Sequence, residues 1–579
     1  MGKIVETLID RFDGGMTNLI RRKEERFSRI LNHFNISTDG MRLIPNLSME
    51  ADGSAGDTEK LVRFLSVNAK HYGLGVVSGT TKAKIFERAS LPAGAWGAST
   101  TGEDSNTGRK ETLFIAYENQ TKIYGARANT IWSYQYATNT YETSERSLTH
   151  AAIEQGLVHS KDDILYIPYD NKIAKNNAGT WTDAALTLPT NYVISSICEY
   201  GNYIAIACKA VNSNNIGNNS VVYLWDRDTS LTTLSESIDW GVGELLILEE
   251  LEGNLIGVTS QASISAFTHP KIIFKYWNGG TMAKQFLEII ASTTAVAGHI
   301  LGKQRMNKRI AFMMDLTINS VRYDGVWSIG KNELGEFSLS LDYLINNDTA
   351  IASPIMKGFH ILGDYLTAAF LDNSVYVINR SNDDSDYATA TSVYESLIKN
   401  LGDSDKTKKL LGATLLFEPL PAAGVVRLFY KKDEETAFTR IFTFGTDDKI
   451  SHGANQIEIG SDTVTMTIAS PAVVTLTNHD LVAGQAIRFR TTGALPTGVT
   501  AGTIYYVISA GLAANTFRFS ATSGGSAVNT SGSQSGTHTL ERDANLTEFK
   551  EIQFKIESSG NAVITGLKFK AEFIDKEFY

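Results

Sequence analysis

One unit recurs along this chain: a β-rich apolar run, a short polar turn, a second β-rich run ending near an aromatic residue, and a polar stretch. The aromatic residues recur at steps of 44 to 52 residues, at Phe86, Trp132, Trp181, Trp225, Trp277, Trp327 and Tyr376. A four-stranded propeller blade needs roughly 40–50 residues. The spacing therefore predicts an all-β fold with a β-propeller of six to seven blades over residues 62–400. The alternative is chance spacing, because no rigid signature such as a repeated Trp-Asp pair accompanies the aromatic residues.

The hairpins of this propeller can be read from the turns. Asn, Asp and Gly tolerate the positive φ of tight turns, and they place turns near Gly79, Asn119, Asn171, Gln261 and Asn373. The paired runs are 75–77 with 84–86, 113–117 with 122–124, 164–169 with 172–174, 203–208 with 221–223, 254–258 with 272–274, 310–314 with 321–323, and 366–371 with 375–377.

The pattern changes after residue 400. Apolar runs at 413–417, 425–430, 440–444, 456–459, 551–556 and 564–573 predict a C-terminal β-sandwich, with a first half over 401–462 and a second over 541–579. Residues 463–540, rich in Thr, Ala, Gly and Ser and almost free of acids, predict a small inserted β domain. An N-terminal arm is expected over 1–61. Its residues 17–32 have roughly helical apolar spacing, with an extended arm as the alternative. We expect the segment up to about Gly56 to be partly mobile in the free monomer.

Composition narrows the class of protein. The chain has 579 residues, 42% hydrophobic and 20% charged, which is ordinary for soluble folded domains. Its net charge of −10 argues against a surface that grips nucleic acid, although an acidic wall would let DNA slide past. The first residues lack the apolar stretch of a signal peptide, and no run has the length of a membrane-spanning helix. We therefore expect folding in a cytoplasm and no membrane span.

Paired carboxylates were considered because glycosidases also use propellers. The candidates are Asp226 and Asp228, and a second cluster of Asp383, Asp384 and Asp386. Both lie in predicted loops, where solvated turn acids are the simpler interpretation. The second cluster is also a candidate for Ca²⁺, which binds several oxygen ligands from one loop. It is a weak one, because it lacks the Gly and the terminal Glu of an EF-hand loop.

Other chemistry-bearing residues are scattered. None of the zinc-protease, C-x-x-C, P-loop and G-x-S-x-G motifs is present. No partner at metal-ligand spacing accompanies His150, His159, His360 or His452. We therefore expect them to be ordinary surface or core residues rather than metal ligands. Cys198 and Cys208 are interpreted as small buried hydrophobic residues, with a disulfide as the alternative if their strands pair. The sequence thus predicts no enzyme, and no catalytic, cofactor-binding or metal site.

Three segments resemble a known family. Residues 11–16 (RFDGGM) followed by 31–36 (LNHFNI) resemble the start of propeller-type phage tail proteins. The inserted segment resembles a small β module of phage tail proteins, through 481–485 (LVAGQ), 491–498 (TTGALPTG), 502–507 (GTIYYV) and 515–520 (NTFRFS). Residues 551–556 (EIQFKI) and 564–569 (ITGLKF) resemble the terminal sandwich strands of the same proteins. Together these segments make the chain similar to the nozzle, or tail tubular protein B, family of short-tailed phages.

The resemblance implies a structural virion protein, assembled in the bacterial cytoplasm, that forms a homohexameric ring below the tail adaptor. The ring would enclose the DNA exit channel, pass genomic DNA without specific binding, and contact adaptor and fibre or spike proteins. The alternative from another class is a peripheral host-recognition or carbohydrate-binding tail protein, because exposed aromatic rings also stack on sugars.

Overall fold

The computed structural model describes residues 4–12, 16, 28–32, 34–35, 42–46, 49–52, 59–77, 82–89, 96–98, 104–105, 113–127, 129–149, 153, 155–210, 219–229, 234–261, 271–290, 300–306, 308–318, 321–331, 335–344, 355–363, 365–372, 375–381, 391–402, 405–433, 435–445, 461–477, 479, 481, 483–542 and 548–574. Within these ranges the only helical element is the single 3₁₀ turn η2 (Glu118–Gln120). The chain divides into two compact units: Leu47–Asp386, and Met1–Asn46 together with Tyr387–Tyr579.

The unit Leu47–Asp386 is a β-propeller. Its described strands fall into seven successive antiparallel groups of four or five strands, which we call its sheets. In chain order these are β6 (Glu59–Val67), β7 (Lys70–Val77), β8 (Lys82–Arg88), β9 (Gly97–Ala98) and β10 (Asp104–Ser105); β11 (Phe114–Tyr117), β12 (Lys122–Arg127), β13 (Thr130–Gln135) and β14 (Thr140–Ser147); β15 (Leu157–His159), β16 (Ile164–Tyr169), β17 (Lys172–Asn177) and β18 (Thr180–Thr187); β19 (Tyr192–Tyr200), β20 (Tyr203–Ala210), β21 (Asn219–Trp225) and β22 (Glu236–Val242); β23 (Glu244–Leu251), β24 (Asn254–Gln261), β25 (Lys271–Trp277) and β26 (Lys284–Ile290); β27 (Ile300–Met306), β28 (Arg309–Met314), β31 (Gly325–Lys331) and β32 (Phe337–Leu344); and β33 (Ile355–Leu362), β34 (Tyr365–Asp372), β35 (Val375–Ser381) and β5 (Met49–Ala51).

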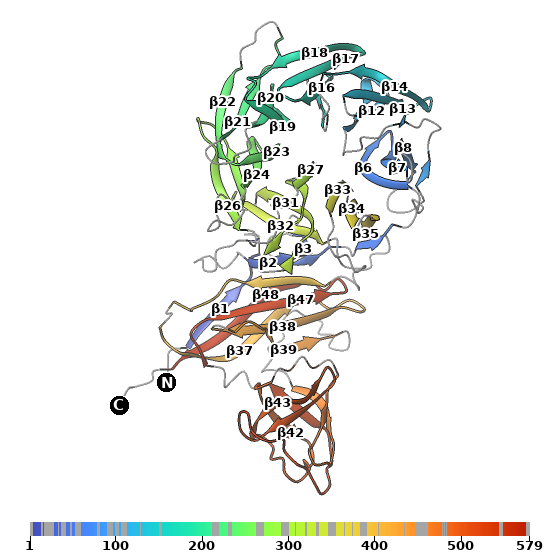
Figure 1. Cartoon of the computed structure of the whole chain (residues 1–579). Coiled ribbons are helices and arrows are strands. Elements are labelled where there is room, and N and C mark those ends of the chain that lie inside the picture. The colour runs from blue at the N-terminus through green and yellow to red at the C-terminus, as the bar shows by residue number, and fades with distance from the viewer. Residues whose placement is uncertain are drawn as a thin grey trace. The chain divides into compact units, whose positions relative to one another are not determined.

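The sheets stand around a common centre (Figure 1). First strands of neighbouring sheets contact one another there: β6 with β11, β15 with β19, β19 with β23, β23 with β27, and β27 with β33. Strand β33 of the last sheet contacts β6 of the first, which closes the ring. The last sheet is completed from the N-terminal side, because Met49–Ala51 pairs antiparallel with β35. The ring is therefore closed by a strand that precedes every other propeller strand in the chain.

Apolar clusters join neighbouring sheets. Ile131 and Leu165 share one buried cluster, and Val222 and Leu248 share another. A further cluster joins the first sheet, through Leu61, to Ile378 of the last. A sheet of four strands cannot bury both faces alone, so stacking in a ring is what covers them.

The aromatic residues of the repeat fall on successive sheets. Six of the seven lie on the third strand of their sheets, and Trp181 instead lies on β18, the fourth strand. Trp132, Trp225 and Trp327 are among the largest fully buried side chains. Gly125 on β12 faces Trp132 in register, and a Cβ there would lie 1.9 Å from the indole ring. Trp132 and Trp225 pack in clusters between neighbouring sheets, which supports their interpretation as packing residues.

Six of the seven expected hairpins form as predicted. Asn119 lies in η2 and Asn171 lies in the turn between β16 and β17. Strand β24 ends at Gln261, whereas Gly79 and Asn373 lie outside the described residues. The hairpin of 310–314 with 321–323 was wrong. Strand β28 pairs with β31, because β30 (Val321–Arg322) turns back on β29 (Thr317–Ile318) in a short hairpin of its own.

The second unit contains a two-sheet β-sandwich. One sheet has the order β1 (Ile4–Ile9), β48 (Ile564–Phe573), β37 (Lys408–Phe417) and β46 (Glu548–Phe549). The other runs β2 (Ser28–Asn32), β36 (Ser392–Ser396), β47 (Ile552–Ser559), β38 (Val425–Lys432) and β39 (Thr439–Phe444). Phe554 and Phe569 pack between them with ring centroids 4.6 Å apart. The short strands β3 (Phe34–Asn35) and β4 (Ile44–Pro45) pair with each other.

The expected insertion is a closed six-stranded barrel. Its order is β40 (Ser461–Met466), β41 (Val474–Thr475), β44 (Thr516–Ser520), β43 (Ile504–Ala513), β42 (Ala486–Thr491) and β45 (His538–Arg542). The barrel has its own core, which includes Phe489, Phe517 and Phe519. Entry and exit strands are adjacent, because Ser461 pairs with Glu541. Its ends therefore lie side by side, as an insertion into another domain requires.

The unit boundaries differ from the expected 62–400. The propeller unit begins at Leu47 because β5 belongs to its last sheet, and it ends at Asp386 because β36 pairs with β47 of the sandwich. Part of the expected arm is strand: β1 pairs with β48, and β2 pairs with β36. The helix expected over 17–32 is wrong at Ser28–Asn32, where cross-strand pairing outweighs the local helical spacing. Residues 17–27 and the run 456–459 lie outside the described residues.

Candidate functional site

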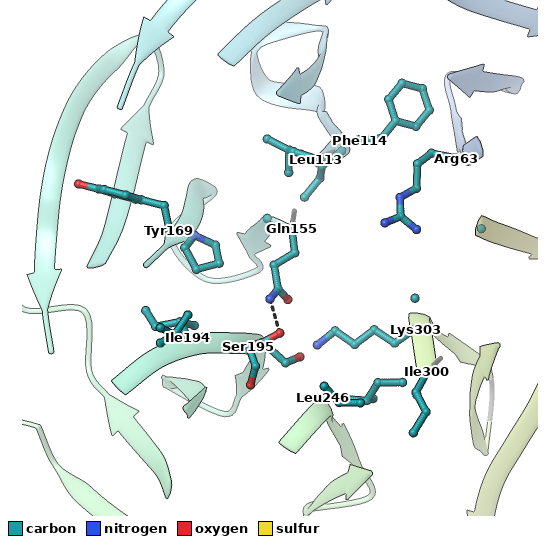
Figure 2. Close-up of a pocket in the computed structure, with 18 of the residues that line it drawn as sticks. Arg63, Leu113, Phe114, Gln155, Tyr169, Ile194, Ser195, Leu246, Ile300 and Lys303 are labelled. Carbon is teal, nitrogen blue, oxygen red and sulfur yellow. Dashed lines mark hydrogen bonds between the residues drawn. The ribbon is translucent and has the colours of Figure 1, made fainter. Parts of the chain in front are cut away.

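The first candidate is the axial cavity of the propeller. It measures about 560 Å³ and is lined by residues of all seven sheets. Its walls expose polar and apolar surface in nearly equal parts, and Phe114, Ile194, Leu246 and Phe359 are among the apolar side chains. Arg63, Gln155 and Lys303 point into the same space (Figure 2). This volume lies within the range of small-ligand pockets.

The polar side chains of the cavity bind main-chain atoms of neighbouring sheets. Gln155 donates to the carbonyl of Ser195 at 2.7 Å and accepts from the amide of Ile197 at 3.3 Å. The Ser195 hydroxyl donates to the carbonyl of Leu245 at 2.5 Å. Each first strand is an edge of its sheet, and an edge carries main-chain groups that need partners. These side chains supply the partners and link the third, fourth and fifth sheets.

Lys303 extends this linkage over three sheets. Its ammonium group donates to the carbonyls of Ile197 and Leu248, both at 2.6 Å, and lies 3.0 Å from a carboxylate oxygen of Glu249. An ammonium group has three N–H donors, and three acceptors surround this one. Lys303 of the sixth sheet therefore holds the fourth and fifth sheets together.

Two further junctions use the same chemistry. Gln304 exchanges hydrogen bonds with the main chain of Ile361, whose amide donates to the Gln304 carbonyl at 2.8 Å. Arg63 donates to the carbonyl of Lys357 at 2.7 Å, which joins the first sheet to the last. These polar side chains at the axis stabilise the ring, because they form hydrogen bonds between sheets.

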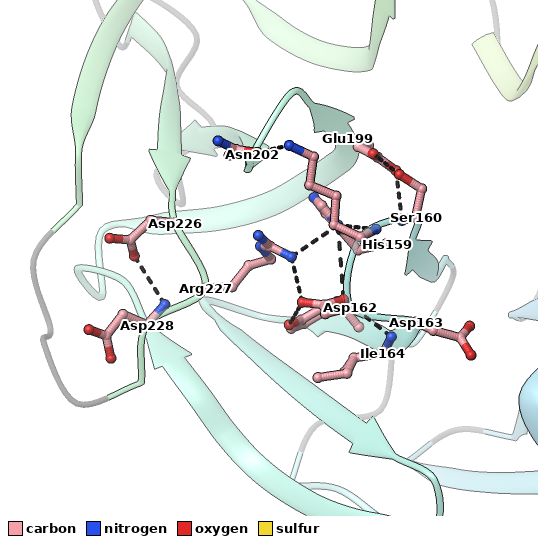
Figure 3. Close-up of polar contacts among 12 residues, drawn as sticks. His159, Ser160, Asp162, Asp163, Ile164, Glu199, Asn202, Asp226, Arg227 and Asp228 are labelled. Atoms are coloured by element: carbon pink, nitrogen blue, oxygen red, sulfur yellow. Dashed lines mark hydrogen bonds and ion pairs between the residues drawn. The ribbon is translucent and has the colours of Figure 1, made fainter.

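The second candidate lies around the carboxylates Asp226 and Asp228 (Figure 3). The amide of Asp228 donates to the Asp226 carboxylate at 3.0 Å, so the two acids share one tight loop. Asp226 is exposed, as expected of a turn acid. Arg227 between them has φ +71° and turns its side chain toward the neighbouring sheet. The two acids thus do not flank a cleft as a glycosidase pair would.

Sequence reasoning missed what Arg227 contacts. Its guanidinium lies 2.5 Å from the Asp162 carboxylate and 3.0 Å from Nδ1 of the fully buried His159. A guanidinium only donates, so Nδ1 of His159 accepts and the ring is neutral with its proton on Nε2. Burial lowers the pKa of His159, as does Arg227, although Glu199 opposes the shift. The cluster joins the third and fourth sheets through residues that are 65 and 68 positions apart, so no local motif could reveal it.

The other residues considered have these places. Asp383, Asp384, Asp386, His150 and His452 lie outside the described residues. Within the described ranges, no group of three or more His, Cys, Asp or Glu side chains gathers as a metal site would require. His360, for which no partner was expected, contacts Ser66 together with His71.

The two cysteines are buried free thiols, as the simpler interpretation held. Their strands do pair, but Cys198 lies opposite Ala205 and Cys208 lies opposite Ile194. Burial raises the pKa of both thiols above the usual range. A buried thiol with a raised pKa is not a nucleophile.

Comparisons with known proteins add little to the geometry. No helix in the described part of the chain has the length and apolar character needed to cross a membrane. No family model and no curated protein matches the sequence. Among solved structures the chain is similar to BBS1N, from a crystal structure of BBS1N in complex with ARL6DN, soaked with mercury. The similarity covers 58% of this chain and 97% of that one, at 13% identity and a TM-score of 0.35, which supports no inference about function.

Proposed function

We propose that this chain is a structural protein of a bacteriophage tail, and that copies of it form a nozzle ring around the DNA exit channel below the adaptor. The proposal rests on the resemblance of residues 11–16, of the inserted segment and of the closing strands to that family. In this proposal the chain is no enzyme, genomic DNA passes without specific binding, and fibre or spike proteins attach to the ring.

The observation that carries the structural role is the use of the polar atoms at the propeller axis. In catalytic clefts, acids, bases and donors converge on a space where substrate can react. Here Gln155, Ser195 and Lys303 instead bind carbonyls of neighbouring sheets. Side chains engaged in this way support a rigid scaffold for assembly rather than a reaction.

The size of the axial cavity supports a channel between copies. At about 560 Å³ the cavity has the volume of a small-ligand pocket and is far too small for a duplex. A DNA path therefore requires several copies around a common axis, which closed rings build from heterologous contacts between two different faces of each subunit.

Reconstruction of particles that carry this chain tests the proposal. We expect six copies around a central channel at the tail tip, in contact with the adaptor. A peripheral trimeric spike without a channel would establish the host-recognition alternative instead. The charge of the channel wall is a separate readout: we expect it to be acidic, and a basic lumen would refute the electrostatic part while leaving the ring intact.

A matched set of substitutions tests the absence of hydrolysis. Asp226→Asn and Asp228→Asn keep the size of each side chain and remove its charge, and we expect infectivity and assembly near wild type. The control is Asp162→Asn, which weakens the contact with Arg227. It should lower the stability of the chain without changing any degradation of host glycans. If Asp226→Asn or Asp228→Asn particles assembled normally but no longer degraded host glycans, the chain would be an enzyme.

A further inference from the structure

The junction between the first and last sheets of the propeller differs from the others, because it closes the ring. Strand β33 contacts β6 there, and Leu61 and Trp96 of the first sheet share a buried cluster with Ala369 and Ile378 of the last. Sheets next to each other in the chain stay close through their connection. The first and last sheets have only this junction and the short strand β5.

Two histidines meet at this junction on one hydroxyl group. The Ser66 hydroxyl lies 2.6 Å from Nδ1 of His71, on the first sheet, and 2.5 Å from Nε2 of His360, on the last. The two rings are 6.4 Å apart, and His71 is only 6% exposed. A hydroxyl group has one proton to donate. The contacts are therefore satisfied when one imidazole nitrogen accepts from Ser66 and the other donates to it, with both rings neutral.

Protonation removes this balance. When both rings carry two protons, both nitrogens donate to Ser66, whose own proton loses its acceptor, and two cations face each other across the junction. The carboxylates nearby already neutralise other bases: Glu87 pairs with Lys70 at 2.8 Å, and Asp52 pairs with Arg88 at 2.8 Å. Arg63, another base, spans the junction through its 2.7 Å hydrogen bond to the main-chain carbonyl of Lys357.

We propose that this junction is an acid-sensitive closure of the propeller, at which protonation of His71 and His360 separates the first sheet from the last. The device is independent of the proposed function, since it depends only on side chains within the propeller. In neutral solution the ring is closed. In acid the ring opens at this junction while the other sheets keep their contacts.

The direction of the pH dependence follows from burial. Burial lowers the pKa of His360 to about 4, with His71 adding to the shift, and burial and then Arg88 lower the pKa of His71. A base whose pKa is lower in the closed ring than in the open form stabilises the closed ring. This stabilisation is complete above the ordinary histidine pKa of about 6.5, and it is lost as the pH falls toward the pKa in the closed ring. For His360 the equilibrium constant that favours the closed ring falls about tenfold for each pH unit, on the order of 300-fold between pH 6.5 and 4.

Hydrogen exchange of the full-length chain between pH 7 and 4 measures the opening, after correction for the intrinsic pH dependence of exchange. We expect amides of β6, β33 and β5 to lose protection by up to about 300-fold as pH falls, whereas the central strands β20 and β24 stay protected. If β6 and β33 lose no more protection than β20 and β24, there is no local closure and the proposal fails.

Substitutions then assign the effect to the two rings. The double variant His71→Gln, His360→Gln stays neutral at every pH and retains groups that bond to Ser66, so we expect the acid response of β6 and β33 to disappear. His479→Gln, at a buried histidine of the barrel, is the control and should leave that response unchanged. A double variant that opens at the same pH as wild type would overturn the proposal; if it does not fold, the wild-type profile decides alone.

Discussion

The propeller and the inserted barrel are both closed β structures, but they close by different means. The barrel closes through main-chain hydrogen bonds, because β45 pairs with both β40 and β42. The propeller closes through side chains between sheets and through three residues of β5 paired with β35. Main-chain pairing tolerates most side chains, whereas a side-chain closure depends on a few particular residues.

This difference predicts where each structure is vulnerable. Single substitutions at the propeller closure should have large effects, whereas the barrel should be insensitive to events in the propeller and dispensable for it. A spectroscopic probe separates the two, because all seven tryptophans of the chain lie within Leu47–Asp386: Trp96, Trp132, Trp181, Trp225, Trp240, Trp277 and Trp327. Tryptophan fluorescence therefore reports on the propeller alone.

The largest effect is expected for Asp52→Ala. Asp52 follows β5 and pairs with Arg88, and their side chains are only 2% and 1% exposed. Asp52 also accepts from the Trp96 indole at 3.0 Å. Removing one partner of a buried ion pair costs about 3–5 kcal/mol, because the other charge stays buried. We expect the denaturant midpoint followed by tryptophan fluorescence to fall accordingly.

A matched control for Asp52→Ala is Glu418→Ala in the sandwich. Glu418 pairs with Arg42 at a similar distance of 2.7 Å, but both side chains are about 40% exposed. An exposed pair is worth about 0–1 kcal/mol. Because tryptophan does not report on the sandwich, the stability of Glu418→Ala is measured by calorimetry, and a loss as large as that of Asp52→Ala would refute the special role of the propeller closure.

An intermediate effect is expected for Gly125→Ala inside the second sheet. The new Cβ would lie 1.9 Å from the Trp132 ring, so the indole has to move in a packed interior. Overpacking of this kind costs about 1–3 kcal/mol. Gly97→Ala is the control, since a Cβ there meets only the Glu87 carbonyl, at 3.8 Å. Equal tryptophan melts of the two variants would contradict the packing argument.

The smallest effect is expected from removing the barrel. Replacing residues 463–540 by a short Gly/Ser linker should leave the tryptophan transition unchanged, because Ser461 and Glu541 are paired neighbours and closing a short loop costs little. The truncated chain should stay soluble and melt cooperatively in calorimetry. Aggregation, or a lower tryptophan midpoint, would show that the barrel is no independent module.

Features that depend on neighbours along the chain were predictable from sequence. Six of seven hairpins and the inserted domain followed from turn residues and composition, which act locally. The failed hairpin shows the limit of this approach: Val321–Arg322 had the expected pattern, but Thr317–Ile318 is a nearer partner and leaves β31 to pair with β28. Trp181 likewise keeps the aromatic spacing yet lies on the fourth strand.

Features that join distant segments were not predictable. Ser66 and His360 are 294 positions apart, and no local pattern at either residue distinguishes it from an ordinary surface residue. The same holds for β1 with β48, and for Arg227 with His159. The loop that holds Asp226 and Asp228 could be expected from sequence, because its contact joins residues only two positions apart. These clusters become visible only once the fold brings the separate sheets side by side.

The position of β5 has a consequence for how the protein is made. Translation releases Met49–Ala51 from the ribosome long before its partner strand Val375–Ser381. At about 5–20 residues per second, the roughly 320 residues between them take about 15–65 seconds to synthesise. Throughout that interval six sheets can fold in order while the first and last strands of the circle are still apart. Completion of the ring is therefore a late event of biosynthesis, and any chain released before residue 381 carries an open circle with two unprotected edges.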